Sequence, residues 1–141
     1  MTSTQWLLAP AFIHVAIVMV QGLRMAAGRT AAFRSGRVKL ADADDGKLSW
    51  PAPVRHLSET YSNQFEIPVL FYAILAFLLI TGFGDNVQIV LAWVFAAARI
   101  VQTVVHTTTN NIRQRGLSFG VSVLALLAMW IWFGLRLYAI G

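Results

Sequence analysis

Charged and amide side chains lie inside two long apolar stretches of this chain, where such groups are costly. In the first stretch, Asn63 and Glu66 are separated by about one helical turn. In the second, Arg99, Gln102 and His106 are spaced three and four residues apart. Ionisable groups at membrane depth usually face a bundle interior or a water-filled cavity. Two apolar segments that carry opposite charges therefore indicate a polar site between helices.

The spacing places each set of polar residues on one helix face, because residues three or four apart are neighbours on a helix surface. The stripe on the first segment consists of Arg55, Glu59, Asn63 and Glu66. Pro68 follows two residues after Glu66. Within a membrane helix this proline frees the carbonyl near Gln64, which predicts a kink and a pocket beside it.

Six residues are predicted to line one cavity at the cytoplasmic side of the bundle: Arg24, Asn63, Glu66, Arg99, His106 and Arg115. The cavity would be positive in character, with a single carboxylate. Arginine binds carboxylates, in a bidentate manner when the geometry allows it. Glu66 could accept an ammonium group or pair with Arg99. The pattern favours a small ligand that carries both carboxylates and an amine.

Each of these polar residues also has a purely structural explanation. Glu66 and Arg99 could form an ion pair that specifies helix packing. Asn63 could form a hydrogen bond between helices. Arg24 and Arg115 stand near helix ends, where basic residues commonly reach the headgroups.

The three histidines, His14, His56 and His106, show no metal-ligand spacing, and we predict no metal site. His14 is a lone polar residue in an apolar segment, which favours a hydrogen bond between helices. His106 is close to the end of its segment and is better explained as a polar helix-end residue than as a catalytic base.

The composition is that of a membrane protein. Of the 141 residues, 57% are hydrophobic and 12% are charged, whereas a soluble domain carries about 25% charged residues. The net charge of +5 does not indicate nucleic-acid binding, because the basic residues flank apolar segments. The chain has no cysteine, so any thiol chemistry must use a thiol that a substrate brings.

Four apolar segments predict an all-α integral membrane protein, a four-transmembrane-helix bundle in a single domain of residues 1–141. The segments cover residues 5–27, 58–82, 87–108 and 117–140, and each is close to the ~20 residues that cross a bilayer core. The run from Gly82 to Asp85 predicts a short turn. Such a tight link would make the second and third helices antiparallel neighbours.

The long connection, residues 28–57, holds six of the eleven lysine and arginine residues. By the positive-inside rule it is cytoplasmic, and both termini lie outside an inner or plasma membrane. The connection turns acidic at Asp42, Asp44 and Asp45 and ends with Trp50 and two prolines. Two interpretations stay open: a solvated loop with an interfacial tryptophan, or a partly ordered flap over the site.

At these positions the chain resembles the MAPEG family, the membrane-associated proteins in eicosanoid and glutathione metabolism, in a bacterial-type form. Asn63-Gln-Phe-Glu66-Ile-Pro68 is similar to the family's second-helix Asn-x-x-Glu followed by Pro. Arg99 and Arg115 are similar to its third-helix arginine and to the arginine just before its fourth helix. The resemblance covers most of the chain, including its length and the order of both polar stripes.

The resemblance implies a homotrimer in the lipid bilayer, with glutathione as co-substrate bound between neighbouring subunits and open to the cytoplasmic side. By position, the glutathione contacts would be Arg24, Asn63, Glu66, Arg99, His106 and Arg115. Arg115 would be the catalytic residue, because an arginine near the glutathione sulfur favours the thiolate. The implied activity is that of a microsomal-type glutathione transferase, or of a peroxidase, on lipophilic small molecules from the membrane.

The chain departs from the family pattern at four positions. Ser62 stands where family enzymes often have arginine, and Gln102 and His106 stand where many have histidine and tyrosine. Phe119 replaces a tyrosine that some members have at the start of helix four. The lost hydroxyl groups keep an alternative open: a non-catalytic trimeric membrane protein whose cavity holds a lipid or a thiol. A small transporter is disfavoured, because the sequence shows no inverted repeat.

Overall fold

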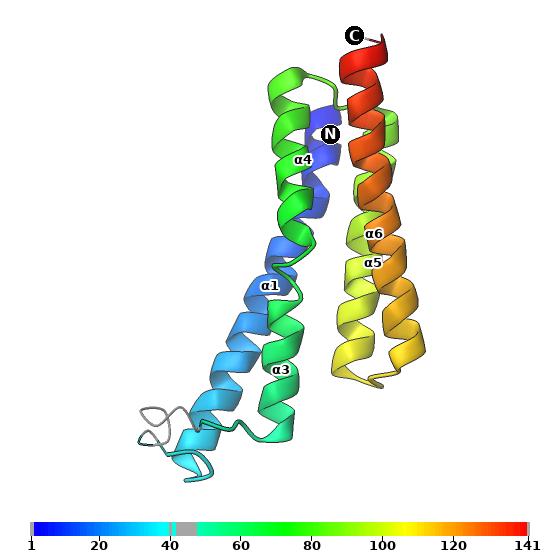
Figure 1. The fold of residues 1–141 in the computed structure, drawn as a ribbon. Helices are drawn as coiled ribbons and strands as arrows, with labels where there is room; N and C mark the ends of the chain where they lie inside the picture. Colours follow the sequence, from blue (N-terminus) through cyan, green and yellow to red (C-terminus); the bar gives the residue numbers. More distant parts are fainter. Residues whose placement is uncertain (1, 40, 42–47, 141) are drawn as a thin grey trace.

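The computed structural model describes residues 2–39, 41 and 48–140, and in this part of the chain the elements are all helical (Figure 1). They are α1 (Ser3–Arg34), α3 (Ala52–Ser62), α4 (Pro68–Thr81), α5 (Asn86–Thr107), α6 (Ile112–Leu135) and a terminal π-helical turn η1 (Arg136–Ile140). The acidic run at Asp42, Asp44 and Asp45 lies outside the described residues.

Three helical segments are long and apolar enough to cross a membrane: Ser3–Arg34, Asn86–Thr107 and Ile112–Tyr138. The fourth apolar helix, α4, has only 14 residues. At 1.5 Å per residue it is about 21 Å long, shorter than the ~30 Å hydrocarbon core. By length and composition, the described residues therefore contain three candidate spans and one shorter apolar helix.

Helix α1 is longer than the predicted first helix and extends beyond residue 27 to Arg34. It begins with a capping box, in which the Thr2 hydroxyl accepts from the Gln5 backbone N–H and the Gln5 side chain accepts from the Thr2 N–H. Further along, α1 packs closely on α3 at Gly22. A Cβ atom there would lie 3.1 Å from the Tyr61 ring, so a larger residue would require that ring to shift by a few tenths of an ångström.

The predicted second helix, residues 58–82, is two helices in the structure. Helix α3 begins at Ala52, because Pro51 and Pro53 fit the start of a helix, where the missing N–H costs nothing. Residues 63–67 form a turn, and α4 then begins at Pro68. The predicted kink is thus a complete break, since the Pro68 ring cannot follow Gln64 at helical spacing without clashing with its carbonyl.

The turn predicted at residues 82–85 is present and joins α4 to α5. Gly82 ends α4 in the left-handed conformation, with φ of +72°. Asp85 caps α5 by accepting a hydrogen bond from the Gln88 backbone N–H at 3.0 Å. Its second carboxylate oxygen accepts from the Trp132 indole at 2.8 Å, which fixes the turn against α6.

The main apolar core lies toward the end of the bundle where both termini lie (Figure 1). It is built from α1, α4, α5 and α6: Leu7, Phe71, Ile74, Leu75, Leu78, Ala92, Phe95, Ala125, Leu126, Met129 and Phe133. Helices α4 and α5 run in opposite directions and meet in this core through the stacked rings of Phe71 and Phe95, whose centroids are 4.2 Å apart.

A smaller cluster closes the opposite end, where the described parts of the first connection pack against α1 and α3. Trp50 packs edge-on against Phe33 with ring centroids 5.3 Å apart. The Arg29 guanidinium lies 5.0 Å from the centroid of the Trp50 ring. The part of the connection next to α3 is therefore attached to the helices through a tryptophan that is partly buried in protein.

Candidate functional site

Arg99 is the largest fully buried side chain among the described residues, with 0% of its surface exposed. One terminal nitrogen, Nη1, donates to Gln102 Oε1 at 2.6 Å. The other, Nη2, donates to Gln64 Oε1 at 3.0 Å and to the backbone carbonyl of Asn63. A buried charge is tolerated only when hydrogen bonds compensate it, and here three oxygens do so.

The break between α3 and α4 supplies one of these oxygens. Asn63 is the C-cap residue of α3, and the last carbonyls of a helix lack partners within it. Arg99 reaches across from α5 and binds the carbonyl of Asn63. The C-terminal end of a helix is also the negative end of its dipole, which favours a cation. Arg99, on a neighbouring helix, therefore provides the hydrogen bond that the carbonyl at the C-terminal end of α3 lacks.

Gln64 connects this arginine to the rest of the interior and is 3% exposed. Its Oε1 lies 3.2 Å from His14 Nε2, and its Nε2 donates to Thr103 Oγ1 at 3.2 Å. His14 Nδ1 lies 2.7 Å from the Tyr72 hydroxyl. Since Oε1 can only accept, His14 carries its proton on Nε2 and accepts the Tyr72 hydroxyl on Nδ1. The hydrogen bond between helices that was predicted for His14 is confirmed.

Sequence reasoning gave the Gln64 side chain no role. The available signal was its position in the same polar turn as Asn63 and Glu66, in front of a proline. Gln64 lies off the stripe that carries those two residues, because it follows Asn63 directly. A side chain on that other face reaches His14 of α1 and Arg99 of α5, and only the packing of three helices brings those partners together.

Glu66 does not form the structural ion pair with Arg99 that was one of its two explanations. Its side chain is exposed, and among the described residues it has no ion-pair partner. It remains close enough to Arg99 to act on it electrostatically. The terminal nitrogens of Arg99 donate instead to the oxygens of Gln64, Gln102 and Asn63. The Glu66 carboxylate is left available to another group.

A second polar group lines a pocket of about 370 Å³ toward the other end of α5. Its walls include Arg24 of α1, His56 of α3, and His106 and Asn110 at the end of α5. Arg115, just inside α6, donates to Asn110 Oδ1 at 2.7 Å and acts electrostatically on His106. Two guanidinium groups therefore flank this pocket.

The six predicted site residues thus fall into two neighbouring groups within one chain. Asn63, Glu66 and Arg99 gather at the helix break, whereas Arg24, His106 and Arg115 gather around the pocket. Gln102, which lies on α5 between Arg99 and His106, is held by Arg99.

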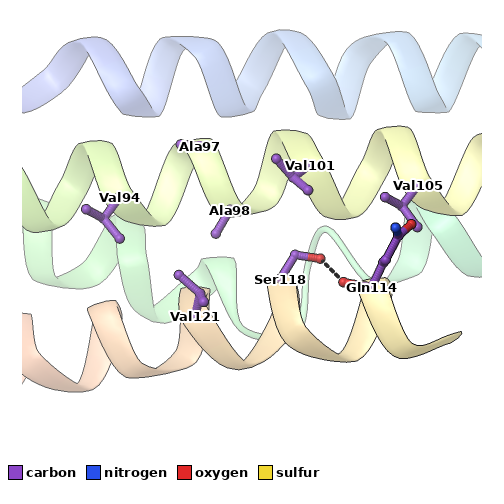
Figure 2. A pocket seen from close by; sticks show the side chains of 8 residues that line it. All are labelled: Val94, Ala97, Ala98, Val101, Val105, Gln114, Ser118 and Val121. Atoms are coloured by element: carbon purple, nitrogen blue, oxygen red, sulfur yellow. Dashed lines mark hydrogen bonds between the residues drawn. The ribbon is translucent and has the colours of Figure 1, made fainter. Parts of the chain in front are cut away.

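An apolar groove of about 570 Å³ runs between α5 and α6 (Figure 2). Its lining residues are Val94, Ala97, Ala98, Val101 and Val105 of α5, and Gln114, Ser118 and Val121 of α6. The small side chains of Ala97 and Ala98 leave the space, and the Ser118 hydroxyl donates to the Gln114 carbonyl at 2.7 Å. This groove could accept an apolar chain.

Within the residues that the structure describes, the elements are all helical, and three long apolar helices with a buried, hydrogen-bonded arginine define a membrane helical bundle with a polar interior. The sequence profile of the MAPEG family matches residues 7–135, nearly the whole chain. The protein belongs to the MAPEG family and is an integral membrane protein of this glutathione and eicosanoid metabolism family. Comparisons with curated proteins and with solved structures found no match.

Proposed function

We propose that this protein binds glutathione and acts as a glutathione transferase or peroxidase on lipophilic electrophiles in the membrane. The family match carries the proposal. The pocket beside Arg24 and His106, with Arg115 at its side, adds support, because its guanidinium groups suit the two carboxylates of glutathione. The exposed Glu66 carboxylate would receive the glutathione ammonium group.

The proposal includes a four-crossing homotrimer. Helices α3 and α4 follow one another along α1, and together with the link at residues 63–67 they would form the fourth crossing (Figure 1). Both described ends of the chain lie on the same side of the bundle, as an even number of crossings requires. The pocket lies at the end that the charge pattern predicts to be cytoplasmic. A neighbouring subunit would cover the exposed Arg24 and Glu66 and enclose the ligand.

In the transferase reaction, the glutathione thiol first loses its proton to water, and the Arg115 guanidinium stabilises the thiolate. The thiolate sulfur then attacks the electrophilic carbon. A carbon–sulfur bond forms, and the leaving group departs with the electrons of its bond. The lipophilic acceptor would come from the bilayer, and the groove between α5 and α6 offers it an apolar surface.

Conjugation of glutathione to a chloronitrobenzene tests this reaction. We expect Arg115→Ala to lower kcat/KM by about 10²- to 10³-fold, the usual loss for one electrostatic stabiliser. Arg113→Ala is the matched control, because Arg113 is an exposed arginine two residues away. Full activity and unchanged thiolate absorbance in Arg115→Ala would contradict the catalytic role.

One observation favours a second candidate, a non-catalytic binding or structural protein whose cavity holds a lipid or a thiol. Both terminal nitrogens of Arg99 donate hydrogen bonds within one chain, so this residue already has a structural role without any ligand. Calorimetric titration with glutathione in detergent separates the candidates. Binding without turnover supports the second candidate, and the absence of binding contradicts the first.

A further inference from the structure

Two histidines and a glutamate meet beside the pocket, although fifty residues separate the histidines along the chain. His56 and Glu59 are one turn apart on α3, and His106 approaches them from α5. One ligand atom from each of the three lies within 4.8 Å of the others. We propose that His56, Glu59 and His106 bind a divalent transition metal ion, with Zn²⁺ as the best fit.

The strongest support comes from His106. This residue is 6% exposed, and its Nε2 is buried without a hydrogen-bond partner. A buried polar atom without a partner is destabilising and needs an explanation, such as a bound ion. A metal ion held by the His106 ring at Nε2 would give this buried nitrogen the partner that it lacks. Neutral imidazole nitrogen and carboxylate oxygen are also the ligands that Zn²⁺ uses in three-ligand sites with an open position.

The geometry needs a small adjustment that the structure permits. Two ligand atoms on a tetrahedral zinc ion stand about 3.4 Å apart, given bond lengths near 2.1 Å. Ligand atoms that stand at the upper end of the 4.8 Å range reach that spacing by side-chain rotation. The side chains of His56 and Glu59 are 48% and 51% exposed, and their only mutual contact is a 3.5 Å approach of Nδ1 to Oε2. They can therefore move toward the fixed, buried His106.

Glu59 is needed for metal binding because the other charged groups around the site are positive. Arg115 acts electrostatically on His106, and Arg24 lines the same pocket, so the surroundings disfavour a further cation. Glu59 is the carboxylate that acts on His106 in the opposite sense. Arg55 also lies near Glu59, but its Nε is 3.9 Å from Glu59 Oε1 and the pair is exposed, so this ion pair is weak. The Glu59 carboxylate is therefore free to bind a metal.

The inference concerns a different ligand from glutathione, and Zn²⁺ binding is measured in the absence of glutathione. Protein in detergent, free of any histidine tag, is titrated with Zn²⁺ by calorimetry and with Co²⁺ by visible absorption. We expect one saturable site per chain. Glu59→Gln and His56→Ala, at exposed positions, should each weaken Zn²⁺ binding at least tenfold. His106→Gln should do the same.

Glu66→Gln is the control, since it removes an exposed carboxylate outside the metal cluster. It should keep Zn²⁺ affinity but lose glutathione affinity, whereas Glu59→Gln should show the reverse. The absence of a saturable Zn²⁺ site, or equal Zn²⁺ affinity in Glu59→Gln and Glu66→Gln, would overturn the metal site and leave the glutathione proposal untouched.

Discussion

Replacing Gln64 by leucine tests whether the buried polar network stabilises the fold. Leucine is close to glutamine in size, so the substitution removes hydrogen bonds and creates little cavity. It leaves Arg99 Nη2 with the Asn63 carbonyl alone and deprives His14 Nε2 and Thr103 Oγ1 of their partner. Each group that loses its partner is buried or nearly so, and lipid offers none of them a replacement hydrogen bond.

The magnitude follows from hydrogen bonds between membrane helices. These average about 0.6 kcal/mol and reach about 1.7 kcal/mol. The bond to the charged Arg99 belongs at the upper value, and the bonds to His14 and Thr103 belong at the average. We therefore expect Gln64→Leu to lower the free energy of unfolding by about 3 kcal/mol. The measurement is unfolding by sodium dodecyl sulfate in mixed micelles, followed by far-ultraviolet circular dichroism.

Gln114→Leu is the matched control, because Gln114 is exposed at the start of α6 and its side chain forms no hydrogen bond within the described residues. Its stability should stay within about 0.5 kcal/mol of the parent protein. A Gln64→Leu variant as stable as this control would refute the view that the network stabilises the fold.

Two further substitutions test local packing. Asp85→Ala removes the α5 cap and the bond to Trp132, and it should cost about 2 kcal/mol in the same unfolding assay; a loss below about 0.5 kcal/mol would show that the turn needs neither bond. Gly22→Leu forces a side chain against Tyr61 and should cost about 1–3 kcal/mol, whereas Gly120→Leu, with open space around it, should be nearly neutral. Equal stability of these two glycine variants would contradict the close packing of α1 on α3.

Local signals in the sequence were enough for the elements that depend on local chemistry. The third predicted helix, residues 87–108, agrees with α5 to within one residue at each end, and Asp85 of the predicted turn caps the start of α5. Helix α6 begins earlier than the predicted residue 117. Asn111 accepts hydrogen bonds from the backbone N–H groups of Arg113 and Gln114, so residues 112–116, which precede the predicted fourth segment, form the first turn of the helix.

The helix break shows where local reasoning stops. Pro68 predicted a disturbance, but its extent depends on Arg99, which compensates the freed Asn63 carbonyl from another helix. Without that donor, the open backbone would be too costly in an apolar surrounding. Helical periodicity reports which residues share a face. It does not report which faces of different helices meet.

The same limit applies to the candidate site. The two polar stripes put Asn63 and Arg99 on different predicted helices, and in the structure Arg99 donates to the backbone carbonyl of Asn63, whereas Glu66 of the same stripe is exposed. Gln64 and the cluster of His56 with His106 were out of reach of sequence spacing. Their contacts join residues more than thirty positions apart, and neither partner is unusual by itself.

The five tryptophans lie in two separate regions, so their fluorescence can report on the two ends of the bundle separately. Trp93 donates to the Trp6 carbonyl and Trp132 to Asp85, so together with Trp130 they report on the end that holds both termini. Trp50 reports alone on the opposite end, beneath Arg29. Exchange of Trp50 for phenylalanine would therefore yield, by difference, the emission of a single fluorophore on the side of the bundle where the pocket lies.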